Sequence, residues 1–310
     1  MNVPSDVLIE IMRLSLETMC EWSKCQRVSK QWRECCRKPR AIAFLTPQLD
    51  QLARLGPLCA MVRSAEHFLT DLRHLETWSD LQVLQSVPFL SSLFVNARLV
   101  DWARVARIRT LRKLHVWNCD QDLDALFLGA PSSGLQDLEI HKCAQFNRRS
   151  LSLLPNFEHL ERLSLQKVNI QSKDLHMLAS FSRLMHLELT DCPLIYSVEC
   201  VSSLTQLRTL SLSGCGFIQN LRPVRELLHL KVLNLDRCWG LKSRQNLEHL
   251  HSLWNLQVFS ASMWFDSEGL CILMRWPHLK QVTLRDCKFD GRAKKAFVAW
   301  CGKRKVAFSL

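Results

Sequence analysis

Glycine and proline are scarce in this sequence, at 9 and 10 residues of 310, and no stretch rich in them or in serine is long enough to form a flexible linker. Because 47% of the residues are hydrophobic and 23% are charged, the chain can bury a sizeable core, which argues against a largely disordered protein. We therefore expect one continuous folded architecture.

Targeting signals are also missing. The sequence has no Asn-x-Ser/Thr glycosylation site, and residues 1–6 lack the charged and then apolar pattern of a secretory signal. No apolar run approaches the roughly 20 residues that cross a bilayer. These features predict a cytoplasmic or nuclear protein without a membrane span, in which the 14 cysteines stay reduced.

Signatures of catalysis are missing as well. The chain has no G-x-G-x-x-G, G-x-x-x-x-G-K-[ST], H-E-x-x-H or G-x-S-x-G motif. Glu248, His249 and His251 fit the polar face of a helix better than a metal site. The adjacent Cys35 and Cys36 have no identifiable His or Asp partner. We expect no enzyme activity, no metal site and no cofactor.

What the chain does contain is an internal repeat. Leucines and a cysteine recur in the frame L-x-x-L-x-L-x-x-C, whose first residues lie 21 to 26 positions apart. The copy at Leu160 has Val168 in the cysteine position, and the copies at Leu90 and Leu256 are weaker. The copies begin at Leu90, Leu111, Leu135, Leu160, Leu184, Leu207, Leu230, Leu256 and Leu279.

The frame has a direct physical interpretation. Alternate residues of a short strand point the same way, so positions four and six of each copy should stack on those of neighbouring copies. A second apolar pair between strands, at helical or 3₁₀ spacing, should close the other side of the core. These pairs are Leu151/Leu154, Leu175/Leu178, Val198/Val201, Val224/Leu227, Leu247/Leu250 and Leu270/Leu273. The column of small thiols that should fill the turn after each strand is Cys119, Cys143, Cys192, Cys215, Cys238 and Cys287.

This pattern resembles the cysteine-containing leucine-rich-repeat family over residues 90–290. The resemblance implies an α/β solenoid, a leucine-rich-repeat horseshoe, that acts as a protein-binding module. Residues 46–89 are rich in leucine but irregular, and we interpret them as divergent coils that link the repeats to the N-terminal segment.

Residues 1–45 predict a short α-helical module. Pro4 suits the first turn of a helix, and Leu8 and Ile11 belong to an apolar stripe. Together with the later Val28-Ser-Lys-Gln-Trp32, this pattern resembles an F-box, which implies binding to a Skp-type adaptor of a cullin complex, with Trp32 as the main anchor. The adaptor-binding residues that the resemblance implies are Pro4, Leu8, Ile11, Val28 and Trp32. The alternative is that this module only caps the first coil.

On the sheet of such a solenoid, strand positions three, five, seven and eight should point outward. The residues at these positions are of mixed charge, which argues against a groove that follows phosphates. Trp117 is a large aromatic residue at an outward position, and it either anchors a partner or contacts the preceding coil. The candidate target-binding residues are His115, Trp117, Glu139, His141, Arg162 and Glu188.

The net charge of +12 comes largely from two basic clusters. Residues 98–113 hold six basic side chains and one acidic side chain, and residues 288–305 hold seven and one. We interpret residues 291–310 as a basic amphipathic cap over the last coil. The alternative for both clusters is an electropositive contact with RNA, an acidic protein or an anionic membrane.

Two functional hypotheses follow. The favoured one is the substrate-recognition subunit of a cullin-RING (SCF-type) ubiquitin ligase, whose N-terminal module binds the adaptor while the repeats bind a protein target. The other is a non-catalytic leucine-rich-repeat scaffold within a larger assembly that contains RNA. Nucleic acid is the less favoured partner, because the predicted sheet is of mixed charge.

Overall fold

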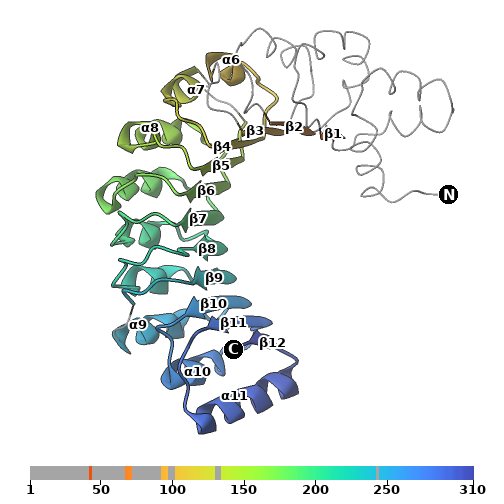
Figure 1. The fold of residues 1–310 in the computed structure, drawn as a ribbon, viewed down its shortest axis with the longest axis vertical. Helices are drawn as coiled ribbons and strands as arrows, with labels where there is room; N and C mark the ends of the chain where they lie inside the picture. Colours follow the sequence, from red (N-terminus) through yellow and green to blue (C-terminus); the bar gives the residue numbers. More distant parts are fainter. Residues whose placement is uncertain (1–41, 44–66, 72–91, 97–101, 130–133, 242–243) are drawn as a thin grey trace, which may run out of the picture. The chain divides into compact units, whose positions relative to one another are not determined.

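The computed structural model describes residues 42–43, 67–71, 92–96, 102–129, 134–241 and 244–310 (Figure 1). The residues expected to contact an adaptor, Pro4, Leu8, Ile11, Val28 and Trp32, lie outside these ranges. The chain divides into two compact units, Met1–Leu135 and Gln136–Leu310.

In the first unit, parallel strands pair in sequence order. They are β1 (Ile42–Ala43), β2 (His67–Asp71), β3 (Ser92–Asn96) and β4 (Lys113–Trp117). The helices α6 (Trp102–Ala106) and α7 (Asp124–Gly129) follow β3 and β4. The repeat frame predicts β3 and β4. It does not predict β1 or β2, and β1 lies at the end of the segment for which only helices are expected.

In the second unit, a longer parallel sheet also follows the order of the sequence. Its strands are β5 (Asp137–His141), β6 (Arg162–Gln166), β7 (His186–Thr190), β8 (Thr209–Ser211), β9 (Val232–Leu235), β10 (Val258–Ser262), β11 (Gln281–Arg285) and β12 (Ala307–Ser309). Each coil therefore adds one strand to the edge of the preceding one.

Helical segments form the opposite side of this unit (Figure 1). They are α8 (Arg148–Leu153), η4 (Leu154–Asn156), η5 (Ser172–Ser180), η6 (Glu199–Ser203), η7 (Arg222–Glu226), α9 (Arg244–His249), η8 (Leu250–Ser252), α10 (Ser267–Leu273) and α11 (Gly291–Arg304), where η denotes a 3₁₀ helix. Among the described helices, none is both long and apolar enough to cross a bilayer.

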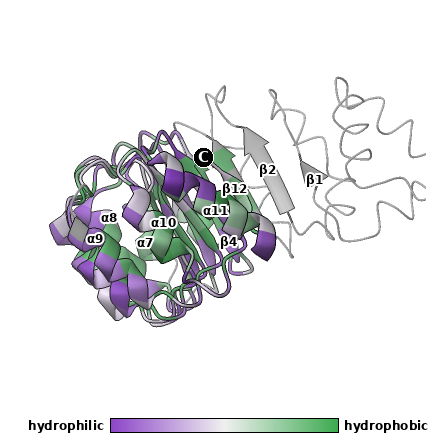
Figure 2. Ribbon diagram, turned by 90° about the horizontal axis from the view of Figure 1, so that it is seen from below, coloured by the Kyte–Doolittle hydropathy of each residue, from purple (hydrophilic) through white to green (hydrophobic). Residues whose placement is uncertain are grey.

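The core of the second unit lies between the strands and these helical segments. Leu187 and Leu189, at positions four and six of their copy, have no solvent exposure on β7. The second apolar pairs are buried as well, for example Val224 and Leu227. Figure 2 shows hydrophobic residues on the strands and hydrophilic residues along the outer loops and helix surfaces. Both apolar columns predicted from the repeat frame are therefore confirmed.

The cysteine column fills the turns between strands and helices. The described cysteines are all free thiols, and Cys192, Cys215 and Cys238 are fully buried. The Sγ of Cys215 donates to the carbonyl of Leu189 in the preceding coil at 3.1 Å. Burial raises the pKa of Cys192 to about 11 and that of Cys215 to about 12. These thiols stay protonated near neutral pH and act as small buried hydrogen-bond donors.

A left-handed residue at position eight follows each strand from β4 to β11. Its N–H points to the next coil, so that Lys142 N donates to the Gln166 carbonyl at 2.9 Å and Lys167 N donates to the Thr190 carbonyl at 2.9 Å. The residues with positive φ at this position are Asn118, Lys142, Lys167, Asp191, Gly214, Arg237, Met263 and Asp286. The turn therefore tolerates several residue types in a conformation that favours glycine and asparagine.

Residues 291–310 form the helix α11 and the strand β12. The carboxylate of Asp290 caps the helix by accepting the Ala293 N–H at 2.7 Å. Phe297 and Cys301 are buried, and the ring of Phe297 lies 6.3 Å from that of Phe308 on β12. Strand β12, which pairs with β11, is absent from the sequence-based expectation. The basic side chains that remain exposed on and beside α11 are Arg292, Lys294, Lys295, Lys303, Arg304 and Lys305.

Candidate functional site

The outward side of β5 to β9, here called the sheet face, carries a network of ion pairs. Arg162 Nε lies 3.6 Å from Asp137 Oδ2, and Arg162 Nη1 lies 4.0 Å from Glu188 Oε1. Glu188 Oε2 also accepts a hydrogen bond from Ser164 Oγ at 3.4 Å. Two predicted target-binding residues, Arg162 on β6 and Glu188 on β7, are thus paired, and Asp137 extends the network to β5.

A second ion-paired group lies where the strands end. Asp191 Oδ1 is 2.9 Å from Arg237 Nη2, and Asp191 Oδ2 is 3.9 Å from Lys167 Nζ. The carboxylate lies directly over Gly214, where a Cβ atom would meet Asp191 Oδ1 at 2.0 Å. The glycine therefore makes room for the side chain that connects neighbouring coils.

The remaining predicted target-binding residues are divided between the two units. His115 and Trp117 lie on β4 in the first unit, where Trp117 is 41% exposed. Glu139 and His141 lie half-buried on β5 in the second unit. The structure therefore places all six residues at outward strand positions, as the frame predicts, and brings Arg162 and Glu188 into direct contact.

Histidines of the sheet face are held in their neutral form. Burial, together with Lys142 and Lys167, lowers the pKa of His141. Burial, together with Arg162, lowers the pKa of His186, whose Nδ1 lies 2.9 Å from Thr209 Oγ1. Near neutral pH, this face therefore presents uncharged imidazoles among its ion pairs.

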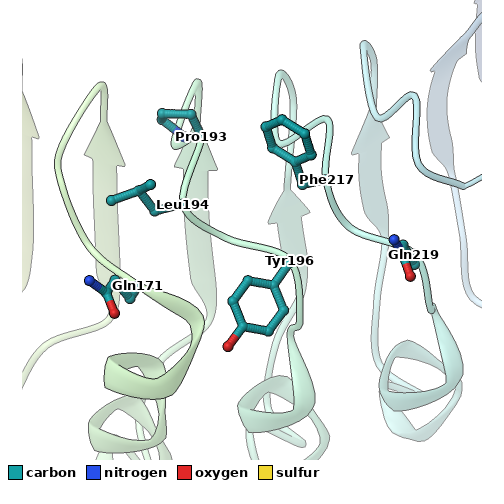
Figure 3. Close-up of a pocket in the computed structure, with 6 residues that line it drawn as sticks. All are labelled: Gln171, Pro193, Leu194, Tyr196, Phe217 and Gln219. Carbon is teal, nitrogen blue, oxygen red and sulfur yellow. The ribbon is translucent and has the colours of Figure 1, made fainter.

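A different surface lies beyond the ends of the strands, across the loops that lead to η5, η6 and η7. A cavity of about 340 Å³ opens there, and we call it the rim groove (Figure 3). It is lined by Gln171, Pro193, Leu194, Tyr196, Phe217 and Gln219. The lining combines apolar side chains with two amides and a phenol hydroxyl, and none of its members is charged.

The apolar side chains of the rim are unusually exposed. Leu194 is 45% exposed, Tyr196 is 60% exposed and Phe217 is 64% exposed. Trp239, which is 53% exposed, continues the strip onto the next coil, where its ring lies 3.1 Å from the place of a Cβ on Gly216. A contiguous group of large exposed apolar side chains is typical of an interaction surface.

Hydrogen bonds between neighbouring coils fix the loops that carry this groove. Ser172 Oγ accepts the N–H groups of Tyr196 at 2.7 Å and Ser197 at 3.0 Å. On the other side, Asn246 Oδ1 accepts the Leu221 N–H at 2.8 Å, and Asn246 Nδ2 donates to the Gln219 carbonyl at 2.9 Å. These bonds join each loop to the neighbouring coil, so that the groove is formed before any ligand binds.

The rim groove is not among the predicted sites, although the sequence contains a signal for it. Leu194, Phe217 and Trp239 follow the column cysteines Cys192, Cys215 and Cys238 by one or two residues, in loops where polar residues are the norm. Within the described ranges, no cluster of three or more His, Cys, Asp or Glu residues is suited to hold a metal. The arrangement of both surfaces is suited to non-covalent binding.

Comparisons with known proteins agree with this architecture. The family model described as At1g61320/AtMIF1, LRR domain, matches residues 97–224. An internalin of Listeria monocytogenes is similar in structure, with a TM-score of 0.52 and 18% identity over 82% of this chain and 76% of that chain. A leucine-rich-repeat protein of Leptospira interrogans has a TM-score of 0.52 and 14% identity over 81% of this chain and 62% of its own length.

These likenesses carry information about fold and not about ligand, because the identities are 18% and 14%. No curated protein matches the sequence. The strand ladder, the two buried apolar columns and the matched family model agree with one another. The chain therefore contains a leucine-rich-repeat domain with solenoid architecture.

Proposed function

We propose that this chain is a non-catalytic protein-binding subunit, the substrate receptor of an SCF-type ubiquitin ligase. A leucine-rich-repeat domain indicates protein–protein interaction, since stacked coils present a broad surface whose outward residues vary independently of the core. The observation that carries the protein-binding part of the proposal is the preformed rim groove, whose large apolar side chains are 45–64% exposed. Such a group of side chains is costly to leave in water unless a partner covers it.

In this proposal, residues 1–45 bind the adaptor and the repeats hold the target. The support for the first part is the resemblance of Pro4, Leu8, Ile11, Val28 and Trp32 to an F-box pattern. The order of this module and the cysteine-type repeats along the chain is also that of F-box leucine-rich-repeat proteins. Ubiquitin transfer would then be catalysed by partner subunits and not by this chain.

We also propose a cytoplasmic or nuclear location. The described cysteines are free thiols, and several of them donate hydrogen bonds within the core. Such an arrangement suits a compartment in which thiols are kept reduced.

The test is a co-purification of the full chain with a Skp-type adaptor and a cullin. A Trp32→Ala/Leu8→Ala double variant should lose both partners, because a buried aromatic anchor usually dominates such an apolar interface. A Trp254→Ala variant is the matched control, since it removes an exposed tryptophan from the repeats. Circular dichroism must show that both variants are folded. If the intact chain retains neither partner, the receptor function is wrong.

The exposed cations of α11 favour a second candidate function, a scaffold subunit in an assembly that contains RNA. None of the cations at 292, 294, 295, 303, 304 and 305 forms an ion pair with another described residue. RNA bound through them should dissociate as the salt concentration rises, because counterion release drives such binding. A Lys294→Glu/Lys295→Glu variant that binds RNA as well as the intact chain does would remove this candidate.

A further inference from the structure

We infer that the rim groove binds an extended acidic segment of a partner protein, which places an apolar side chain between Tyr196 and Phe217. This inference rests on the proposed protein-binding function and specifies its site and the chemistry of the partner. It is supported by the lining of the groove, by the arrangement of the loops and by the charges around them.

The apolar lining sets the first requirement for the partner. Leu194, Tyr196 and Phe217 line a cavity of about 340 Å³ (Figure 3). A volume of this size is near the lower end of ordinary ligand sites, and it suits one or two large side chains better than a whole folded surface. Trp239 lies on the next coil and offers a second contact for a segment that continues past the groove.

The polar lining sets the second requirement. The amides of Gln171 and Gln219 and the hydroxyl of Tyr196 can donate to or accept from a peptide backbone. These groups come from three successive loops, and neighbouring coils lie roughly 4.8 Å apart, as adjacent strands do. A segment that crosses the coils in an extended conformation therefore meets a new loop every one or two residues.

Charge around the groove sets the third requirement. Lys173 and Arg222 are exposed and lie two and three residues along the chain from Gln171 and Gln219. Asp191 is already paired with Lys167 and Arg237, and the buried Asp174 is paired with Arg148 at 3.7 Å. Among the described residues in the first turns of η5, η6 and η7, Glu199 is then the one exposed acid that is outside an ion pair. The surroundings are positive, which favours aspartate and glutamate on the partner.

A single-stranded nucleic acid also uses aromatic side chains and cations, but the groove fits it less well. Base stacking needs aromatic platforms beside cations that track the phosphates. Here Pro193 and Leu194 occupy the places beside the rings, and the lining itself contains no cation. The observations therefore favour an acidic peptide segment over RNA.

The experiment is a selection of random displayed peptides on the full chain, with the Phe217→Ser variant used for counter-selection. The enriched peptides should carry aspartate and glutamate around an aliphatic or aromatic residue. Their affinity, measured by fluorescence anisotropy, should fall at least about tenfold in Phe217→Ser and in Tyr196→Ser, as for an anchor contact. It should stay unchanged in Trp254→Ser, which removes an exposed aromatic residue outside the groove lining.

Several outcomes would overturn the inference. These are the absence of any enriched peptide, enrichment of basic peptides, and affinities that Phe217→Ser leaves unchanged in a folded protein. Binding of poly(U) RNA, or self-association of the chain, that is lost in Phe217→Ser would assign the groove to another occupant.

The adaptor experiment separates this inference from the proposed function. If peptides bind but depend on Arg162 and not on Phe217, the rim groove is excluded while protein binding stands. If acidic peptides bind at the groove but no adaptor is retained, the receptor function fails and the rim site stands.

Discussion

The sheet face and the rim groove belong to the same coils but present different chemistry. On the sheet face, Arg162 contacts both Asp137 and Glu188. On the rim, Tyr196 and Phe217 are 60% and 64% exposed. An ion-paired side chain must give up internal partners to bind a target, whereas burial of an exposed aromatic ring removes apolar area from water without that loss. How readily a side chain binds a partner therefore depends both on its exposure and on the interactions that it already makes within the chain.

The largest expected effect is on the free energy of unfolding, and it should distinguish apolar side chains of the core from those of the rim. Leu210 is fully buried on β8, so Leu210→Ala should lower the free energy of unfolding by about 2–5 kcal/mol. Phe217→Ala should change it by less than about 0.5 kcal/mol, because the ring is mostly in solvent. Urea unfolding followed by circular dichroism measures both variants. A loss near that of Leu210→Ala for the rim variant would show that the rim is part of the core.

A smaller effect on stability is expected at Gly214, which lies between the sheet face and the rim groove. Gly214 has a φ of 76°, and a Cβ there would meet the Asp191 carboxylate at 2.0 Å. Gly214→Ala should therefore destabilise the fold by about 1–3 kcal/mol. Gly302→Ala is the control, since a Cβ at that helical position meets nothing within 4 Å and should stabilise the protein by about 0.5–1 kcal/mol. Equal effects of the two substitutions on the melting temperature would contradict the role of Asp191.

The ion pairs of the sheet face should contribute less than either of these effects. A double-mutant cycle with Arg162→Ala and Glu188→Ala should give a coupling energy below about 1 kcal/mol, because Arg162 is 41% exposed and the pair is 4.0 Å apart. The coupling should shrink further at about 1 M salt, where charges are screened within about 3 Å. A coupling that is insensitive to salt would show that the contact is not mainly electrostatic.

The smallest expected effect is a dependence of stability on pH. In the folded state, the pKa values of His141 and His186 lie below 6.5. The unfolded chain therefore binds protons more readily, and stability should fall as the pH decreases through about 6.5. A His141→Gln/His186→Gln variant should show a shallower decrease in melting temperature between about pH 7.5 and pH 5.5. His249, whose pKa is also lowered, should leave some of the dependence in place.

The strands were predictable because their period is imposed by packing. Every strand from β3 to β11 begins at position three of its copy, including β10 in the degraded copy at Leu256. Even there, Phe259 and Ala261 occupy the two inward positions and are fully buried. A coil must place apolar residues at these positions to bury them against its neighbours, so the sequence carries the pattern directly.

The rim groove and the geometry of the turns could not be predicted from the repeat frame. The groove exists because loops separated by a whole coil, such as those of Leu194 and Phe217, are stacked side by side. The left-handed turn residues include Lys142 and Met263, which have no intrinsic preference for that conformation. At these turns, the hydrogen bonds between coils outweigh the backbone preference of the residue itself. The identity of a single residue therefore does not predict the left-handed conformation.

The last described strand bears on how an edge of the sheet is protected. Strand β12 pairs with β11 over three residues, and all three are exposed. Short strands and nearby lysine side chains make a sheet edge a poor template for the addition of another chain. Because β12 is short and the lysines of α11 come just before it in the sequence, this part of the ladder is protected in both of these ways.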